Sequence, residues 1–451
     1  MRTRFIAGML WLVLAYPLVA QQAEPLSLQQ AVALGLQRSP ERKAAVAETK
    51  AARADIDEAR SSFLPHLNFS EAITRSNDPV YVFGTRLRQS RFTAADFTLN
   101  RLNQPTPISN FATRFDAHWS LFDSFASFLS VRRARQMQEA AQEQLALTDQ
   151  QTVFRVVEAY YALLLATKEL EVAEQSIKTA KAVVEDSSAR VQAGTVVESD
   201  LLSAQVNLAS RQQELFKAQN ATALARAQLN VTLGLALDHE YQPAEALAER
   251  RLEAIPLKDA EERALKARPD LKQISDRVAA QKTGVELAKS AFGPRVNAFA
   301  ASELDNISFF GNGSNNWLAG VELNIDLFSG GEKRARLLHE KAMLEKASAG
   351  KQLAEDRIRI EVRRAFYDWD SAQRVVEVAR AAVSQSEESL RITRNRYAAG
   401  LTTITELLRS EDSVRTAQTN YWSAIYGYNV SYAALELATG SLNQHSPVIT
   451  P

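Results

Sequence analysis

The residue types that most often carry catalysis or bind metals are thinly scattered along this 451-residue chain. Its histidines lie far apart, with no two at ligand spacing on one helix: they are His66, His118, His239, His339 and His445. Cysteine is absent, which excludes thiol catalysis, cysteine metal sites and disulfides. No nucleophile, base and orienting group form a recognisable set. We therefore expect a protein that is not an enzyme and that uses no metal and no cofactor.

The polar residues with the most informative placement follow two glycines, Gly194 and Gly400. Each glycine comes at the end of a long helical pattern, and a left-handed glycine there would end one helix just before a second one starts. Thr403 and Glu406 have the spacing of a capping box, and the helix dipole favours an acid in the first turn. Asp200 stands at the equivalent place after Gly194. Capping and a role for the charge itself both remain open.

The helices that carry these two tips have a seven-residue apolar repeat. In the first helix the repeat is Val156, Leu163, Leu170, Ile177, Val184 and Val191, and in the second it is Val362, Trp369, Val376, Val383, Leu390 and Tyr397. Small residues recur three places after most of these positions, which lets neighbouring helices wrap closely around one another. No proline interrupts the chain between Pro107 and Pro243, so a helix from about residue 128 to 192 would be roughly 100 Å long. This length predicts an elongated coiled-coil body.

The chain also repeats itself. Residues 158–235 match the sequence 206 positions further on, as in Ala193-Gly194 and Ala399-Gly400, and the first helical segment matches at an offset of 229, as in Pro40 and Pro269. We divide the mature chain into a first repeat at 21–239, a connector at 240–256 with one short helix, a second repeat at 257–442 and a mobile C-terminal tail at 443–451.

Four segments alternate between apolar and polar residues, which predicts strands at about 66–75, 111–121, 295–304 and 317–327. Residues 76–110 between the first two read as a loop, with Asn77-Asp78-Pro79 and Pro105-Thr106-Pro107. A length of about ten residues, alternation and aromatic ends are typical of membrane strands, although a soluble hairpin with one wet face has the same pattern.

A signal peptide and the lack of any other apolar run long enough to span a bilayer as a helix favour the membrane. Residues 1–20 have two arginines, an apolar run and Ala20, the layout of a secretory signal peptide. Lysine plus arginine equals aspartate plus glutamate at 53 each, so no basic bias indicates nucleic acid.

Four strands cannot close a barrel, because the smallest membrane barrels have about eight and no open edge is tolerated in lipid. Several chains must therefore share one barrel.

This arrangement resembles the TolC-like outer-membrane efflux protein family. The resemblance covers nearly the whole mature chain and is carried by the opening LSLQQAVAL at Leu26–Leu34, the junctions LFDS at Leu121–Ser124 and LFSGG at Leu327–Gly331, and the two tips RVQAGTVVESDLL at Arg190–Leu202 and RYAAGLTTITELL at Arg396–Leu408. It implies a mainly α fold with a small β part. Three chains would form a 12-stranded β-barrel in the outer membrane and an α-barrel of long antiparallel hairpins across the periplasm, fed by an inner-membrane pump through a periplasmic adaptor.

The resemblance also implies roles for the tip residues. The adaptor would dock on the small residues at the two turns, which are Ala193, Gly194 and Thr195 in the first and Ala399, Gly400 and Leu401 in the second. The gate candidates are Asp200, Tyr397, Thr402, Glu406 and Arg409. Three copies of Glu406 around the axis would attract cations. The family commonly has a second acid where Arg409 stands and an arginine where Thr402 stands, so a pairing of Glu406 with Arg409 could instead hold the tip closed.

The sequence thus predicts an exit duct for a tripartite efflux or type I secretion system, which conducts substrates passively. A periplasmic coiled-coil adaptor or structural protein without a pore is the alternative, and the four alternating strands disfavour it.

Overall fold

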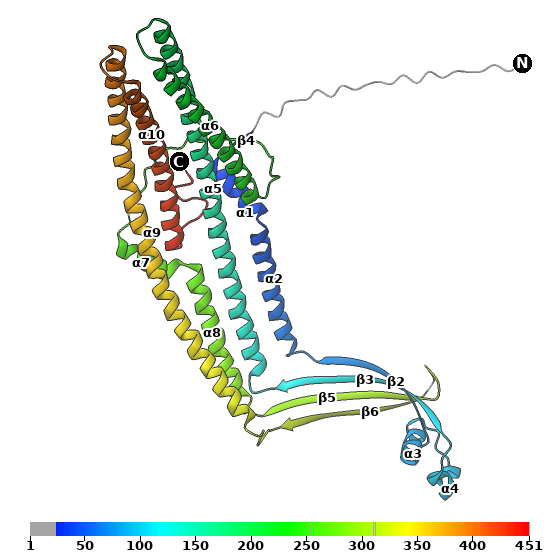
Figure 1. Ribbon diagram of the computed structural model, residues 1–451. Helices are drawn as coiled ribbons and strands as arrows, with labels where there is room; N and C mark the ends of the chain where they lie inside the picture. The colour runs from blue at the N-terminus through cyan, green and yellow to red at the C-terminus, as the bar shows by residue number, and fades with distance from the viewer. Residues whose placement is uncertain (1–23, 254, 310, 312, 451) are drawn as a thin grey trace, which may run out of the picture.

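The long helices and the four-stranded sheet occupy opposite ends of an elongated molecule in the computed structural model, which describes residues 24–253, 255–309, 311 and 313–450 (Figure 1). The expected signal peptide lies outside the described residues. The helices are α1 (Leu28–Arg38), α2 (Pro40–Ser61), α3 (Pro79–Arg88), α4 (Leu99–Asn103), α5 (Ala126–Gln192), α6 (Glu198–Leu233), α7 (Leu257–Ala267), α8 (Pro269–Ser290), α9 (Glu332–Ala398) and α10 (Ile404–Thr439), with a 3-10 turn η1 (Ala94–Phe97). The strands are β1 (Glu24–Leu26), β2 (His66–Ser76), β3 (Ile108–Phe122), β4 (Tyr241–Pro243), β5 (Arg295–Asn306) and β6 (Ser314–Asn324). The fold is mainly helical with a small β part, as predicted.

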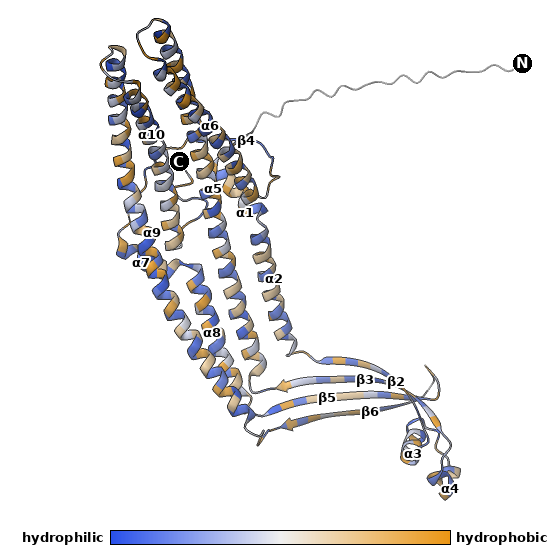
Figure 2. Ribbon diagram, in the orientation of Figure 1, coloured by the Kyte–Doolittle hydropathy of each residue, from blue (hydrophilic) through white to orange (hydrophobic). Residues whose placement is uncertain are grey.

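Two helical hairpins of matched length make up most of the body. α5 and α9 have 67 residues each, and α6 and α10 have 36 residues each. The predicted helix at about 128–192 is confirmed as α5. The heptad positions are buried or partly buried, with Leu163 at 1% exposure and Val362 at 0%. Apolar and polar residues are interspersed along the whole length of each long helix (Figure 2). This pattern is typical of rods that pack on more than one side.

The four predicted strands form one antiparallel sheet in the order β2-β3-β5-β6. Strand β3 joins the two repeats by pairing with β5, so β2 and β6 are the edges of the sheet. The prediction for the fourth strand was wrong at its end, because β6 stops at Asn324 rather than 327. Asn324 pairs with Arg295, the first residue of β5, and Pro294 just before it has no N–H to donate to a longer ladder.

The segment at 76–110 is folded rather than a simple loop, contrary to the prediction. It contains α3, η1 and α4. Phe83, Phe92 and Phe97 pack edge to face around one another, with ring centroids 4.9 and 5.1 Å apart for the two pairs made by Phe92. The buried carboxylate of Asp96 accepts hydrogen bonds from Arg86 and Arg101. A small apolar cluster and a paired acid therefore stabilise this segment.

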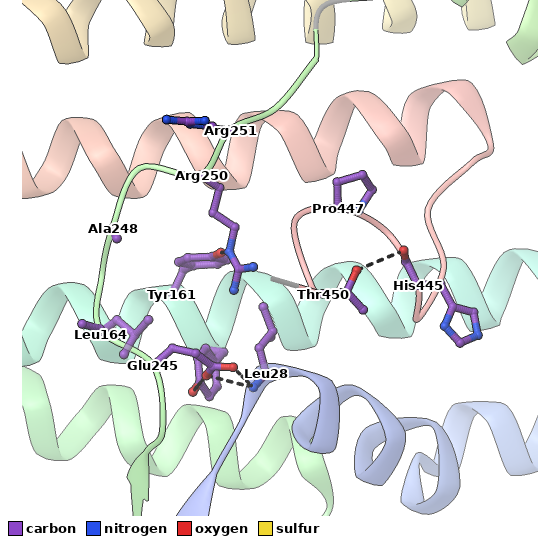
Figure 3. Close-up of a pocket in the computed structure, with 12 residues that line it drawn as sticks. Leu28, Tyr161, Leu164, Glu245, Ala248, Arg250, Arg251, His445, Pro447 and Thr450 are labelled. Carbon is purple, nitrogen blue, oxygen red and sulfur yellow. Dashed lines mark hydrogen bonds between the residues drawn. The ribbon is translucent and has the colours of Figure 1, made fainter.

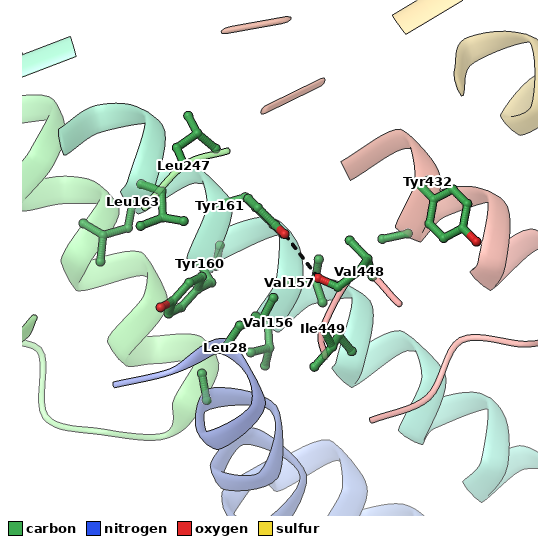
Figure 4. Close-up of a cluster of buried hydrophobic side chains, with 14 of the residues drawn as sticks. Leu28, Val156, Val157, Tyr160, Tyr161, Leu163, Leu247, Tyr432, Val448 and Ile449 are labelled. Carbon is green, nitrogen blue, oxygen red and sulfur yellow. Dashed lines mark hydrogen bonds between the residues drawn. The ribbon is translucent and has the colours of Figure 1, made fainter. Parts of the chain in front are cut away.

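The connector and the tail also differ from the predictions. The described part of the connector contains no helix, and its strand β4 pairs in parallel with β1. The tail is packed rather than mobile: Val448 and Ile449 are fully buried in the core of Figure 4, and the Tyr161 hydroxyl donates to the Val448 carbonyl at 3.2 Å. Apolar side chains separated by prolines can bury without forming a helix, which explains the error.

Within the described ranges, no helix combines the length and the apolar character needed to cross a bilayer.

Candidate functional site: the hairpin tips

Both hairpins end in the same backbone motif. Gly194 and Gly400 have φ of +71°, which favours glycine. In the first tip, the N–H of Thr195 donates to the Arg190 carbonyl at 2.9 Å and the N–H of Gly194 donates to the Val191 carbonyl at 3.0 Å. The second tip repeats both bonds at the equivalent residues. This is the Schellman arrangement that satisfies the last carbonyls of a helix, so both glycines end a helix as predicted.

The surface around these turns is small and open. Ala193, Thr195 and Ala399 are exposed, and Leu401 is 69% exposed. A Cβ added at either tip glycine would meet no atom within 4 Å. The expected docking residues thus lie together at two smooth, accessible turns.

The charged candidates of the second tip lie on the first turns of α10. The Thr403 hydroxyl accepts a hydrogen bond from the Glu406 N–H at 3.4 Å, which is the capping contact expected from the sequence. The Glu406 carboxylate accepts from Arg409 Nη1 at 3.0 Å, with both side chains at least half exposed. The capping contact and the Glu406–Arg409 pair are therefore both present, and the pair lies within α10. Asp200 lies in the first turn of α6 and is partly buried.

Tyr397 and Thr402 are separated by the turn, and their surroundings differ. Tyr397 is 5% exposed, and its ring faces the guanidinium of Arg190 with 5.0 Å between the guanidinium carbon and the ring centroid. Its hydroxyl is buried without a hydrogen-bond partner among the described residues. Thr402 is only partly buried. Tyr397 packs with Ala204, Ile404 and other apolar residues, so the two hairpins touch at their tips.

A charged network between α6 and α10 was missed by sequence reasoning. Arg211 donates to Glu214 at 2.7 Å and to Asp412 at 3.2 Å, and its side chain is only 13% exposed. Arg415 donates to Asp412 at 2.7 Å and lies 3.6 Å from Glu214. The network therefore ties the first hairpin to the second about two to four turns of helix from the tips.

The pKa values nearby follow from this packing. Burial opposes the ionisation of Asp412, but the hydrogen bonds and charges of Arg415 and Arg211 outweigh it and lower the pKa. Burial raises the pKa of Glu411, although Arg394 lies 3.4 Å away. Asp412 is therefore the charged partner of Arg211 at neutral pH.

One sequence signal could have revealed the network. At the offset of the duplication, Arg211 corresponds to Ala417 and Asp412 corresponds to Val206. Both charges thus depart from the repeat at positions that an apolar or small residue occupies in the other copy.

A hollow of about 600 Å³ between the helices and the connector is lined by Leu28 and Thr450, which lie near the two ends of the described chain (Figure 3). Two of its charged side chains are paired, because Glu245 accepts from Tyr160 and from the Leu28 N–H, and Arg250 donates to the Tyr161 hydroxyl. No group of metal-binding side chains was found in the described part of the chain. The hydrogen bonds of Glu245 and Arg250 fasten the connector to α1 and α5.

Two matched hairpins ending in open glycine turns, joined to a sheet with two unpaired edges, define a subunit of a shared tubular channel. The family model described as "Outer membrane efflux protein" matches residues 31–235 and 261–441, and this chain belongs to that family. It is an outer-membrane exit duct that extends into the periplasm, works as a homotrimer and is served by a periplasmic adaptor and an inner-membrane pump. The pore-less adaptor alternative is set aside.

The sequence identity between this chain and individual relatives is low. The chain is 24% identical to the alkaline protease secretion protein AprF of Pseudomonas aeruginosa, over 97% of this chain and 89% of that protein. It is 27% identical to protein CyaE of Bordetella pertussis, over 95% of this chain and 87% of that protein. The solved CmeC outer membrane channel of Campylobacter jejuni superposes with a TM-score of 0.78 at 18% identity, covering 93% of this chain and 87% of the channel.

Proposed function

We propose that the hairpin tips are the periplasmic gate of this duct, and that the gate opens when the second hairpin moves away from the first. The supporting observation is the contact between hairpins near the tips, where Tyr397 lies between Arg190 and the apolar cluster. This contact uses few residues, so a modest rearrangement would release it.

The charged network of Arg211, Glu214, Asp412 and Arg415 would hold the closed state. It is the only set of salt bridges between α6 and α10 in the described residues. The network is partly buried, since the side chain of Arg211 is 13% exposed and that of Asp412 is 47% exposed, and breaking one pair leaves a partly buried charge without compensation. Asp200, Thr402, Glu406 and Arg409 lie closer to the opening, where charge would act on passing ions.

The tip turns would be the docking surface for the adaptor. Ala193, Gly194, Thr195, Ala399, Gly400 and Leu401 offer backbone and small side chains that a partner helix could approach closely, and both turns have the same geometry. The two repeats at 21–239 and 257–442 would each supply one turn. Conduction through such a duct requires no catalytic step, because a pump supplies the energy.

A photo-crosslinking residue placed at Leu401 tests the docking proposal in whole cells. We expect it to capture a periplasmic adaptor, whereas the same residue at the exposed Lys346, at the other end of α9, should not. Equal capture at both positions would contradict the proposal.

Fractionation tests the duct itself. We expect an outer-membrane oligomer that resists sodium dodecyl sulfate and falls apart on heating. A water-soluble monomer would be incompatible with a shared channel.

A further inference from the structure

The two faces of the four-stranded sheet differ in polarity. One face carries most of the large exposed apolar side chains, including Phe69, Phe115 and Trp317, which share a side because Phe69 pairs with Phe115, Phe115 with Ser302, and Ser302 with Trp317. The opposite face carries Arg114, Glu303 and Asn316, which are likewise paired in register. Membrane barrels turn their apolar face to lipid and their polar face to the lumen. The face of Glu303 therefore lines the channel.

The folded segment at residues 77–107, here called the outer segment, is attached to this lumen face. Gln89 lies at its centre and is 6% exposed. Its side-chain amide donates to Asn110 Oδ1 at 2.8 Å and to the carbonyls of Ser109 and Asn306 at 3.1 Å each. These partners belong to β3 and β5, so the amide bridges the two repeats at the end of the sheet that is far from the long helices α5 and α9 (Figure 1).

Further contacts extend across the sheet. Arg88 donates to Glu303 at 3.2 Å, and the Asn316 amide donates to the Arg88 carbonyl at 3.4 Å. Buried Asp305 accepts from Asn110 at 2.6 Å and from Asn316 at 3.2 Å. The outer segment leaves the sheet at β2, one edge, and reaches β6, the other edge. It thus crosses the whole share of the wall that one chain supplies.

The connection between β2 and β3 does not require a segment as long as residues 77–107. In the second repeat, β5 and β6 are joined by residues 307–313 alone. The outer segment is held in shape by its own phenylalanine cluster and by Asp96, as described above. A helix with its side chains is about 10 Å across, and twelve strands enclose a narrower lumen than the 16 to 18 strands of aqueous porins. Three copies on the inner wall would therefore occupy much of the opening.

We propose that the outer segment is a size filter at the outer mouth of the channel, with Gln89 as the residue that positions it against the lumen wall. This inference rests on the proposed duct and adds a second constriction that acts independently of the periplasmic tips. Cargo wider than the remaining opening passes only when the segment leaves the wall.

Cysteine accessibility from outside the cell tests the filter, because the native chain has no cysteine to interfere. His118 is exposed on the lumen face, near the helical end of β3. A His118→Cys variant is treated on intact cells with a maleimide carrying a polyethylene glycol chain the size of a small protein, and separately with N-ethylmaleimide. The bulky reagent reaches this cysteine from outside only through the outer mouth.

With the outer segment in place, we expect rapid labelling by the small reagent and slow labelling by the bulky one. Adding Gln89→Ala should speed the bulky reagent at least tenfold, because the three hydrogen bonds that hold the segment to the lumen wall are lost, and should leave the small reagent unchanged. Replacing residues 77–107 by the sequence of 307–313 should have at least the same effect, and it stands as the second variant if Gln89→Ala disturbs assembly. Gln104→Ala, at an exposed glutamine of the same segment, is the matched control.

Each outcome separates the two proposals. Equal labelling by the bulky reagent with and without the outer segment, in trimers verified by gel, overturns the filter and leaves the duct intact. A cysteine at 118 that even N-ethylmaleimide cannot reach after the segment is replaced would overturn the lumen assignment, and with it the duct proposal on which the filter rests.

Discussion

Removing Arg211 should favour the open gate. The guanidinium is 13% exposed and contacts both Glu214 on its own helix and Asp412 on the opposite hairpin. Arg211→Ala leaves Asp412 with Arg415 alone, and partly buried pairs of this kind contribute about 1 to 2 kcal/mol. If the substitution destabilises the closed state by about 1.4 kcal/mol and leaves the open state unchanged, the ratio of open to closed forms rises about tenfold for each protomer.

The assay is single-channel recording from purified trimers in planar bilayers, with open probability as the readout. Arg211→Ala and Asp412→Ala should each raise it, and the double variant should add less than the sum, since both remove one contact. Exchanging the charges, as Arg211→Asp with Asp412→Arg, should restore part of the closed population. Arg374→Ala is the control, because Arg374 pairs only with Asp370 one turn away on exposed α9.

Two results would refute the reasoning. The first is an open probability for Arg211→Ala that matches the Arg374→Ala control. The second is strict additivity in the double variant, which would mean that the 3.2 Å contact between the hairpins does not couple them.

Three further predictions concern charge, backbone and pH. Glu406→Gln should weaken cation preference measured from reversal potentials, and Arg409→Ala should strengthen it, because Arg409 offsets the carboxylate at 3.0 Å; unchanged selectivity in both would leave Glu406 only its helix-capping position. Gly400→Ala should lower stability to denaturant by about 1 kcal/mol, since φ is +71°, whereas Gly350→Ala in the middle of α9 should raise it by a similar amount. Burial raises the pKa of Glu436 to about 7 from 4.5, against the hydrogen bond from Ser446 and the charge of Arg263, so folding favours its protonated form and stability falls as pH rises between these values. Glu436→Gln should remove that fall and stabilise the protein at pH 8 by at most about 3 kcal/mol, as unfolding curves at pH 4 and pH 8 would measure; an unchanged pH dependence would contradict this assignment.

The elements with strong local patterns could be predicted from the sequence. The heptad repeat leads to α5 and α9, the alternating segments lead to the four strands, and Gly194 and Gly400 mark the turns because only glycine accepts φ near +71° at low cost. The duplication doubled each of these signals. Local periodicity is a property of neighbouring residues, so one chain suffices to reveal it.

Features that depend on distant contacts could not be predicted. Arg211 and Asp412 are about 200 positions apart in the sequence, and the local sequence around each residue does not predict that the two form a pair. Gln89 reads as an ordinary loop glutamine until Asn110 and Asn306 are brought to it by the sheet. The tail seemed polar because Val448 and Ile449 stand among polar residues and prolines, and their burial follows only from where the tail returns to the core.

The equal lengths of the two hairpins carry a consequence for assembly stoichiometry. Since 67-residue and 36-residue helices occur twice per chain, a threefold assembly presents six turns at one height, a rim with near-hexagonal symmetry built from only three polypeptides. A docking partner arranged around the same axis can bind that rim as a trimer or as a hexamer. The partner can distinguish the first hairpin turn from the second only by side chains that differ between them, such as Thr195 in the first turn and Leu401 in the second.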